Sequence, residues 1–171
     1  MKGNTIKVLY GVLALAVVAY WVSTRDNDQR QVERRLDELR ALVEKEAGEA
    51  DLVAANNARR LGEMFTRDFA VYLQPMDETV TDRQRVMQVM LQYRREGERI
   101  AVAFRDQEIE IRDLGGEKVA SVALVAVVHA TVAGEPTREG FRFTFEWRRE
   151  DSEWRMSQVT LVEILEGRLL F

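Results

Sequence analysis

Few residue types in this chain could carry chemistry, and the most distinctive is its single histidine. His129 lies in the apolar run VASVALVAVVHATVAG, residues 119–134, where it is either the catalytic centre of a buried pocket or a polar residue on a packing surface. The chain has no cysteine, which excludes disulfides, thiolate nucleophiles and cysteine-ligated zinc. It also lacks a glycine-rich phosphate loop, a GxSxG elbow and an HExxH motif. The sequence therefore predicts no cofactor and no metal, and acid–base chemistry would need His129 or a buried carboxylate.

The composition is that of an ordinary globular protein. The chain has 171 residues, 46% of them hydrophobic and 32% charged, with a formal net charge of −4. This length predicts one domain with an appendage. Both charge signs are interspersed, so there is no basic stripe of the kind that displaces counterions from nucleic acid. We therefore expect no nucleic-acid partner.

The N-terminal region predicts a membrane anchor. Residues 8–22 are fifteen apolar residues without a charge, and residues 6–24 extend them to a length just sufficient to span a bilayer. The aromatic pair Tyr20 and Trp21 at the far end suits a membrane interface, which favours an uncleaved anchor over a cleaved signal peptide. A short basic tail before one apolar segment favours export, so we expect an extracytoplasmic domain. The predicted segments are an anchor or signal over 1–25, a charged amphipathic helix over 26–50, and the rest of the domain over 51–171.

The chain after the anchor predicts helices followed by strands. Val32, Leu36, Leu39 and Val43 form one apolar stripe along a first helix, which ends near Gly48. A second helix starts from Asp51 as its N-cap, and a third opens on a capping box of Thr81 and Gln84. The segment TRDFAVYL between them is typical of a strand. From Arg99 onward four long strands are separated by hairpin signals at LGGE (114–117), GEPT (134–137) and EDSE (150–153).

The hairpin signals also predict the register of these strands. A two-residue turn at Gly115 and Gly116 pairs Leu114 with Glu117, and the next loop pairs Ala133 with Arg138. A turn at Asp151–Ser152 pairs Trp147 with Met156. A change of parity between Phe104 and Ile109 indicates a β-bulge that bends the sheet.

This order of elements resembles the nuclear transport factor 2-like superfamily, also called SnoaL-like or ketosteroid-isomerase-like. The resemblance covers about residues 30–165, and its most typical stretch is ARRLGEMFTRDFAVYLQP (58–75) before a capped helix. It implies a cone-shaped α+β fold with three helices packed on a strongly bent antiparallel sheet and a pocket between them. Some members are enzymes, and many only bind ligands or partners. A membrane anchor before such a domain also resembles the VirB8-type subunits of envelope secretion complexes.

The predicted register places an apolar pocket on the inner face of the sheet. An aromatic surface with few polar groups is the usual form of a small-molecule site, so this face could bind a small apolar ligand. An alternative is that the same side chains are a satisfied core without a ligand. The predicted ligand-binding residues are Tyr72, Phe143, Trp147, Gln158 and Thr160.

The outer face of the sheet carries an apolar patch that predicts a partner, most simply a second copy in a two-fold contact. The alternative is that the first helix or the C-terminal GRLLF covers this patch. The predicted interface residues are Val125, Val127, His129, Arg142 and Leu161.

The predicted pocket lacks the carboxylate that usually acts as the catalytic base. In the isomerase-like relatives an Asp-Pro step after the first strand supplies the base, and the matching step here is Gln74-Pro75. Asp68 suits a corner cap, the acids at 77 and 78 suit a solvated loop, and Asp106 would reach inward only if the bulge turns it. The sequence thus favours a membrane-anchored, non-catalytic dimerisation, scaffold or ligand-binding module. The alternatives are a SnoaL-like isomerase, hydratase or cyclase and a VirB8-like subunit.

Overall fold

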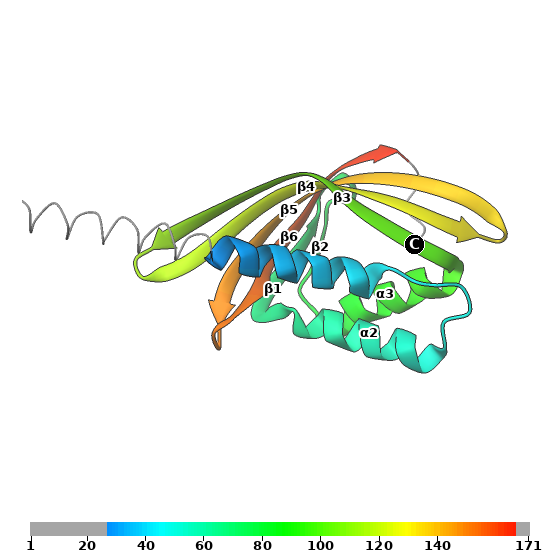
Figure 1. Cartoon of the computed structure of the whole chain (residues 1–171), viewed down its shortest axis with the longest axis horizontal. Coiled ribbons are helices and arrows are strands. Elements are labelled where there is room, and N and C mark those ends of the chain that lie inside the picture. The colour runs from blue at the N-terminus through cyan, green and yellow to red at the C-terminus, as the bar shows by residue number, and fades with distance from the viewer. Residues whose placement is uncertain (1–26, 167–171) are drawn as a thin grey trace, which may run out of the picture.

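The structure, a computed structural model, describes residues 27–166 as three helices on one face of a six-stranded sheet (Figure 1). The α+β class predicted from the sequence is confirmed. The elements are the N-terminal helix (residues 27–43), α2 (Asp51–Glu63), β1 (Phe65–Leu73), the 3₁₀ turn η1 (Gln74–Met76), β2 (Glu78–Val80), α3 (Arg83–Glu96), β3 (Gly97–Leu114), β4 (Glu117–Val132), β5 (Glu135–Glu150) and β6 (Glu153–Glu166).

The sheet has the strand order β2-β1-β6-β5-β4-β3. All neighbouring strands are antiparallel except β1 and β6, which run parallel. The sheet bends strongly, and the three helices lie below it in Figure 1. We call the helix-covered side the inner face and the opposite side the outer face.

Each helix buries one stripe of apolar residues against the inner face. On the N-terminal helix the buried positions are Val32, Leu36, Leu39 and Leu42, while Val43 is only half-buried. Two predicted caps are wrong. Ala50 rather than Asp51 is the N-cap of α2, and Asp82 rather than Thr81 accepts the hydrogen bond from the Gln84 amide at the start of α3. Asp82 lies one residue closer to the first turn, where a carboxylate reaches the free amide.

The hairpin registers are partly as predicted. Leu114 pairs with Glu117, and Trp147 pairs with Met156. The middle hairpin differs, because its turn is the two residues Ala133 and Gly134, both with positive φ. Arg138 consequently pairs with His129 and not with Ala133. This slip along β5 by four residues is even, so each side chain stays on its predicted face.

β-Bulges in β3 and β6 determine which side chains of these two strands lie on the inner face. The predicted bulge in β3 is confirmed between Arg105 and Glu108, where Asp106 has φ +51°. In β6 an unpredicted extra residue, Ser157, lies between the pairs Trp147–Met156 and Glu146–Gln158. Because side chains alternate with period two, this insertion exchanges the inner and outer positions of β6 from Gln158 to Leu161, and a second extra residue, Val162, restores the parity.

The core has two buried apolar clusters on the inner face. The larger one joins the helices to Ala120, Val122, Phe145 and Trp147. The second lies at the other end of β4 and β5 and contains Ile100, Val102, Val128, Ala130, Phe141 and Leu161. We call it the β4–β5 cluster.

Within residues 27–166 no helix has the length and hydropathy needed to cross a membrane. The segment 6–24, predicted as the anchor, lies outside the described residues.

Candidate functional site

A buried carboxyl group lies beside the β4–β5 cluster. Glu139 pairs with Val128 and is 5% exposed. It shares the inner face with Phe141 because the two residues are two positions apart on the same strand. Tyr93, near the C-terminal end of α3, hydrogen-bonds to it. This Tyr93–Glu139 pair joins a helix to the sheet where the surroundings are otherwise apolar.

Burial shifts the pKa values of both groups of the pair. Burial raises the pKa of the Glu139 carboxyl, and the hydrogen bond from Tyr93 partly opposes this shift. Burial, followed by the neighbouring charge and hydrogen bond of Glu139, raises the pKa of the Tyr93 hydroxyl far above its usual range. The tyrosine therefore keeps its proton at neutral pH and donates to the carboxylate. A carboxylate of raised pKa in an apolar site can anchor a ligand or exchange a proton with it.

The surroundings of the pair are apolar. The buried members of the β4–β5 cluster form a sheet surface with a small side chain at Ala130, and Ala126 of the larger cluster lies next to it on β4. Half-buried side chains from β1, α3, β3, β4, β5 and β6 edge this surface, namely Leu73, Tyr93, Phe104, Val132, Phe143 and Ile164. Glu139 is thus a buried carboxyl group at an apolar surface, the kind of polar anchor that small-molecule sites use.

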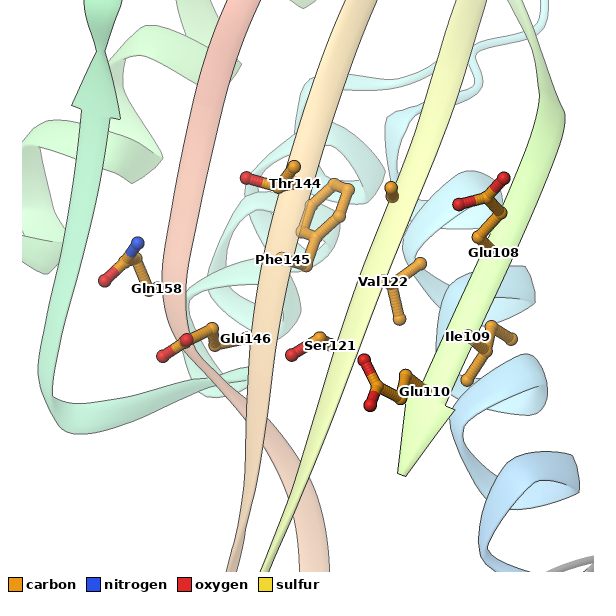
Figure 2. Close-up of a pocket in the computed structure, with 10 residues that line it drawn as sticks. Glu108, Ile109, Glu110, Ser121, Val122, Thr144, Phe145, Glu146 and Gln158 are labelled. Atoms are coloured by element: carbon orange, nitrogen blue, oxygen red, sulfur yellow. The ribbon is translucent and has the colours of Figure 1, made fainter. Parts of the chain in front are cut away.

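The outer face has a different feature, a polar groove of about 280 Å³ (Figure 2). Its polar side chains come from β3, β4, β5 and β6 and are Glu108, Glu110, Ser121, Thr144, Glu146 and Gln158. The Ser121 hydroxyl already accepts a hydrogen bond of 2.7 Å from Arg112. Among the described residues, no three histidine or carboxylate side chains are close enough to hold a metal ion. The groove is open to solvent, whereas Glu139 of the Tyr93–Glu139 pair is buried.

The predicted ligand-binding residues are divided between the two faces. Phe143 and Trp147 lie on the inner face, as predicted, and Trp147 is fully buried with its indole N–H unpartnered. Gln158 and Thr160 are on the outer face, opposite Glu146 and Thr144, because the Ser157 bulge inverts β6. Tyr72, which pairs with Thr160 across the parallel strands, lies there too. These three placements on the inner face were wrong.

The predicted interface residues are mostly on the outer face. Val125, Val127, His129 and Arg142 lie there, with Arg142 opposite Val125. Arg142 forms an ion pair of 3.4 Å with Glu163. Leu161 is 2% exposed in the β4–β5 cluster, so its placement on the outer face was wrong, again because of the bulge. Whether the remaining four form an interface stays a prediction.

The acids considered from the sequence do not reach the inner face. Asp68 is exposed on β1, Asp77 and Glu78 are exposed around η1, and Asp106 points to solvent at its bulge. The buried acid that the sequence analysis did not consider is Glu139. A signal existed, because Glu139 has the same odd parity as Phe141 and Trp147 and lies beyond the predicted hairpin loop at 134–137.

Comparison with known proteins identifies the domain. A family model described as a SnoaL-like domain matches residues 49–161. No curated protein sequence matches the chain.

Three solved structures illustrate the likeness of fold. A proposed scytalone dehydratase from Novosphingobium aromaticivorans superposes with a TM-score of 0.66 at 14% identity, covering 86% of this chain and 93% of that one. A proposed calcium/calmodulin-dependent protein kinase II association domain from Xanthomonas campestris gives 0.60 at 15% identity, covering 78% and 86%. The hexachlorocyclohexane dehydrochlorinase LinA-type3 from Novosphingobium barchaimii gives 0.60 at 8% identity, covering 82% and 90%. At these identities the likeness concerns the fold alone, which enzymes and an association domain share.

Proposed function

The chain belongs to the SnoaL-like domain family, and from this premise we propose that it binds a small, mostly apolar molecule on the inner face of its sheet, beside Tyr93 and Glu139. The observation that carries this proposal is the Tyr93–Glu139 pair within an apolar cluster. A protein interior seldom retains a buried carboxyl group without a partner or a task, because burial disfavours its charged form. An apolar surface with one polar pair is the usual composition of a small-molecule site.

Thermal stability and NMR of the full chain test this proposal. Neutral ring compounds such as cyclohexanol and cyclohexanone should raise the melting temperature, because a ligand that binds only the folded state stabilises it. Chemical shifts should change at the methyl groups of Val128 and not at those of Val125, which lies on the outer face of the same strand. Shifts confined to Val125, or no stabilisation at millimolar concentrations, would contradict the proposal.

Proton transfer is a second candidate function, favoured by the raised pKa of Glu139. A carboxylate becomes a stronger base as its pKa approaches neutrality, and general acid–base groups in enzymes are tuned in this way. Two structural neighbours carry the names of a dehydratase and a dehydrochlorinase, which supports this candidate. Deuterium exchange into cyclohexanone, followed by NMR, should be faster with the wild type than with Glu139→Gln. Equal exchange rates would contradict proton transfer by Glu139, and ligand binding would remain the proposed function.

The uncovered outer face favours a further proposal, self-association of a membrane-anchored chain. None of the described helices covers this face, and its apolar residues Val125 and Val127 are flanked by the ion pair of Arg142. We propose that residues 6–24 anchor the chain and that the domain is extracytoplasmic. Sedimentation of the full chain in detergent should give a dimer that Val125→Glu dissociates and Val53→Glu, on the exposed surface of α2, does not. A strict monomer at tens of micromolar would contradict self-association.

A further inference from the structure

We propose that the ligand of this site is a hydrophobic cation, a small amine whose ammonium group pairs with Glu139 while its apolar body lies on the β4–β5 cluster. This inference rests on the proposed function, since it names the class of molecule that the inner face binds.

Glu139 forms no ion pair with the residues that the structure describes. Its only hydrogen-bond partner among them is the Tyr93 hydroxyl. A carboxylate has two oxygens and about four lone pairs to satisfy, so one donor leaves most of its capacity unused. An unpaired charge in such surroundings is costly, and a cation with N–H donors would offset that cost.

Two cations of the described residues that lie around the Tyr93 end of α3 are engaged elsewhere. Arg94, the residue after Tyr93, donates to Glu49 and to three backbone carbonyls. Lys45, which pairs with Ile100 of the cluster, donates its ammonium group to the carbonyls of Arg94 and Gly97. Neither side chain therefore pairs with the Glu139 carboxylate, which can pair with the cation of a ligand instead.

The surface around the carboxylate suits an apolar cation rather than a hydrated ion. Across the sheet, Phe104, Ala126 and Phe141 lie in one row, next to the row that contains Val128 and Glu139. The rings of Phe141 and Phe143 continue this aromatic surface at a centroid separation of 6.2 Å. Aromatic faces attract cations, and Ala126 is the smallest side chain in this row, between the two phenylalanines. A metal ion would find no suitable ligand set here, because no three histidine, cysteine or carboxylate side chains of the described residues are grouped to hold one.

Other ligand classes fit less well. An anion would meet the negative charge of Glu139 without a compensating donor. A neutral alcohol can donate one hydrogen bond, but a charge-assisted bond between an ammonium and a carboxylate is about twice as strong. The site thus discriminates by charge as well as by hydrophobicity.

Calorimetric titration of the full chain with three compounds of equal ring size, cyclohexylamine, cyclohexanol and cyclohexanecarboxylate, tests the inference. We expect the amine to bind at least about tenfold more tightly than the alcohol, and the carboxylate to bind most weakly. Glu139→Gln should abolish the preference for the amine while the alcohol still binds. Glu135→Gln, the same change at an exposed position of the same strand, should leave the preference intact.

The possible failures are distinguishable. If the alcohol binds as tightly as the amine, or if the preference survives Glu139→Gln, the cationic class is wrong and the proposed binding function stands. If none of the three compounds binds, the proposed function fails and the inference fails with it. A cooperative thermal melt of each variant would show that it folds.

Discussion

Arg94 and Lys45 cap each other's helices. Arg94, on α3, donates from Nη1 to the carbonyl oxygens of residues 42, 43 and 44 at 2.7, 3.0 and 2.9 Å, where the N-terminal helix ends. Lys45, just beyond that end, donates from Nζ to the carbonyl oxygens of Arg94 and Gly97 at 2.7 Å each, where α3 ends. Glu49 neutralises the guanidinium through two hydrogen bonds. Since the last carbonyls of a helix have no partner within it, this exchange satisfies both helix ends and fixes Tyr93 beside Glu139.

Arg94→Met is expected to lower the free energy of unfolding by about 3–5 kcal/mol, because it leaves the Glu49 carboxylate and several carbonyls without partners. Arg94 is only 1% exposed, so water cannot replace it. Urea denaturation measures the loss. Arg95→Met, the exposed neighbour on α3, is the control and should change stability little. Equal effects of the two variants would show that the clamp is not a stabilising contact.

Tyr93→Phe is expected to raise the pKa of Glu139 further, because it removes the hydrogen bond that lowers this pKa while burial still raises it. Carbon NMR of labelled glutamate side chains, titrated from pH 3 to pH 9, measures the shift. Tyr72→Phe, on the outer face, should leave the titration of Glu139 unchanged. A downward shift in Tyr93→Phe would contradict the assigned direction of the hydrogen bond.

Glu139→Gln is expected to raise the stability of the chain relative to wild type at pH 8, and less so at pH 4. The pKa of Glu139 is raised on folding from an unfolded value of about 4.3. A group with a raised folded pKa contributes its stability below the unfolded pKa and loses it as the pH rises through the folded pKa. Glutamine has no such charge to bury. Urea denaturation at both pH values measures the difference, and a variant that is less stable by the same amount at each pH would contradict it.

Asp106→Val is expected to lower the free energy of unfolding by about 1–3 kcal/mol, because a β-branched residue is strained at the φ of +51° that the β3 bulge requires. Asp106→Gly should be neutral or slightly stabilising, since glycine adopts this conformation freely. Arg105→Val, exposed on the same strand beside the bulge, is the matched control. If Asp106→Val and Arg105→Val lower the free energy of unfolding equally, the positive φ at residue 106 is not a source of strain for valine.

Much of the fold followed from local patterns. The apolar stripe from Val32 to Leu39, the glycine turn after Leu114 and the parity change after Phe104 each depend on residues close together in the chain. Such features predicted the helices, the hairpins, the β3 bulge and the side of β4 on which His129 lies. Helix and strand periodicity and turn chemistry act over a few residues, so the sequence contains their cause directly.

The candidate site could be predicted only in part. Phe143 and Trp147 were placed correctly because parity survives an even slip of the hairpin. Gln158, Thr160 and Leu161 were misplaced because one added residue, Ser157, exchanges the faces of β6. A bulge of this kind has no turn signal in the sequence, because it arises where the bend of the sheet requires one strand to have an extra residue relative to its neighbour.

The sequence by itself determined the α+β class, the order of the three helices and of five of the six strands, and the absence of cysteine chemistry. The tertiary structure alone decided that Glu139 meets Tyr93, that Arg94 and Lys45 exchange caps, and that Tyr72, Gln158 and Thr160 face outward. The physical reason is the distance along the chain. A helix or a turn is stabilised by neighbours in sequence, whereas Tyr93 and Glu139 lie on separate elements whose meeting depends on the bend of the whole sheet.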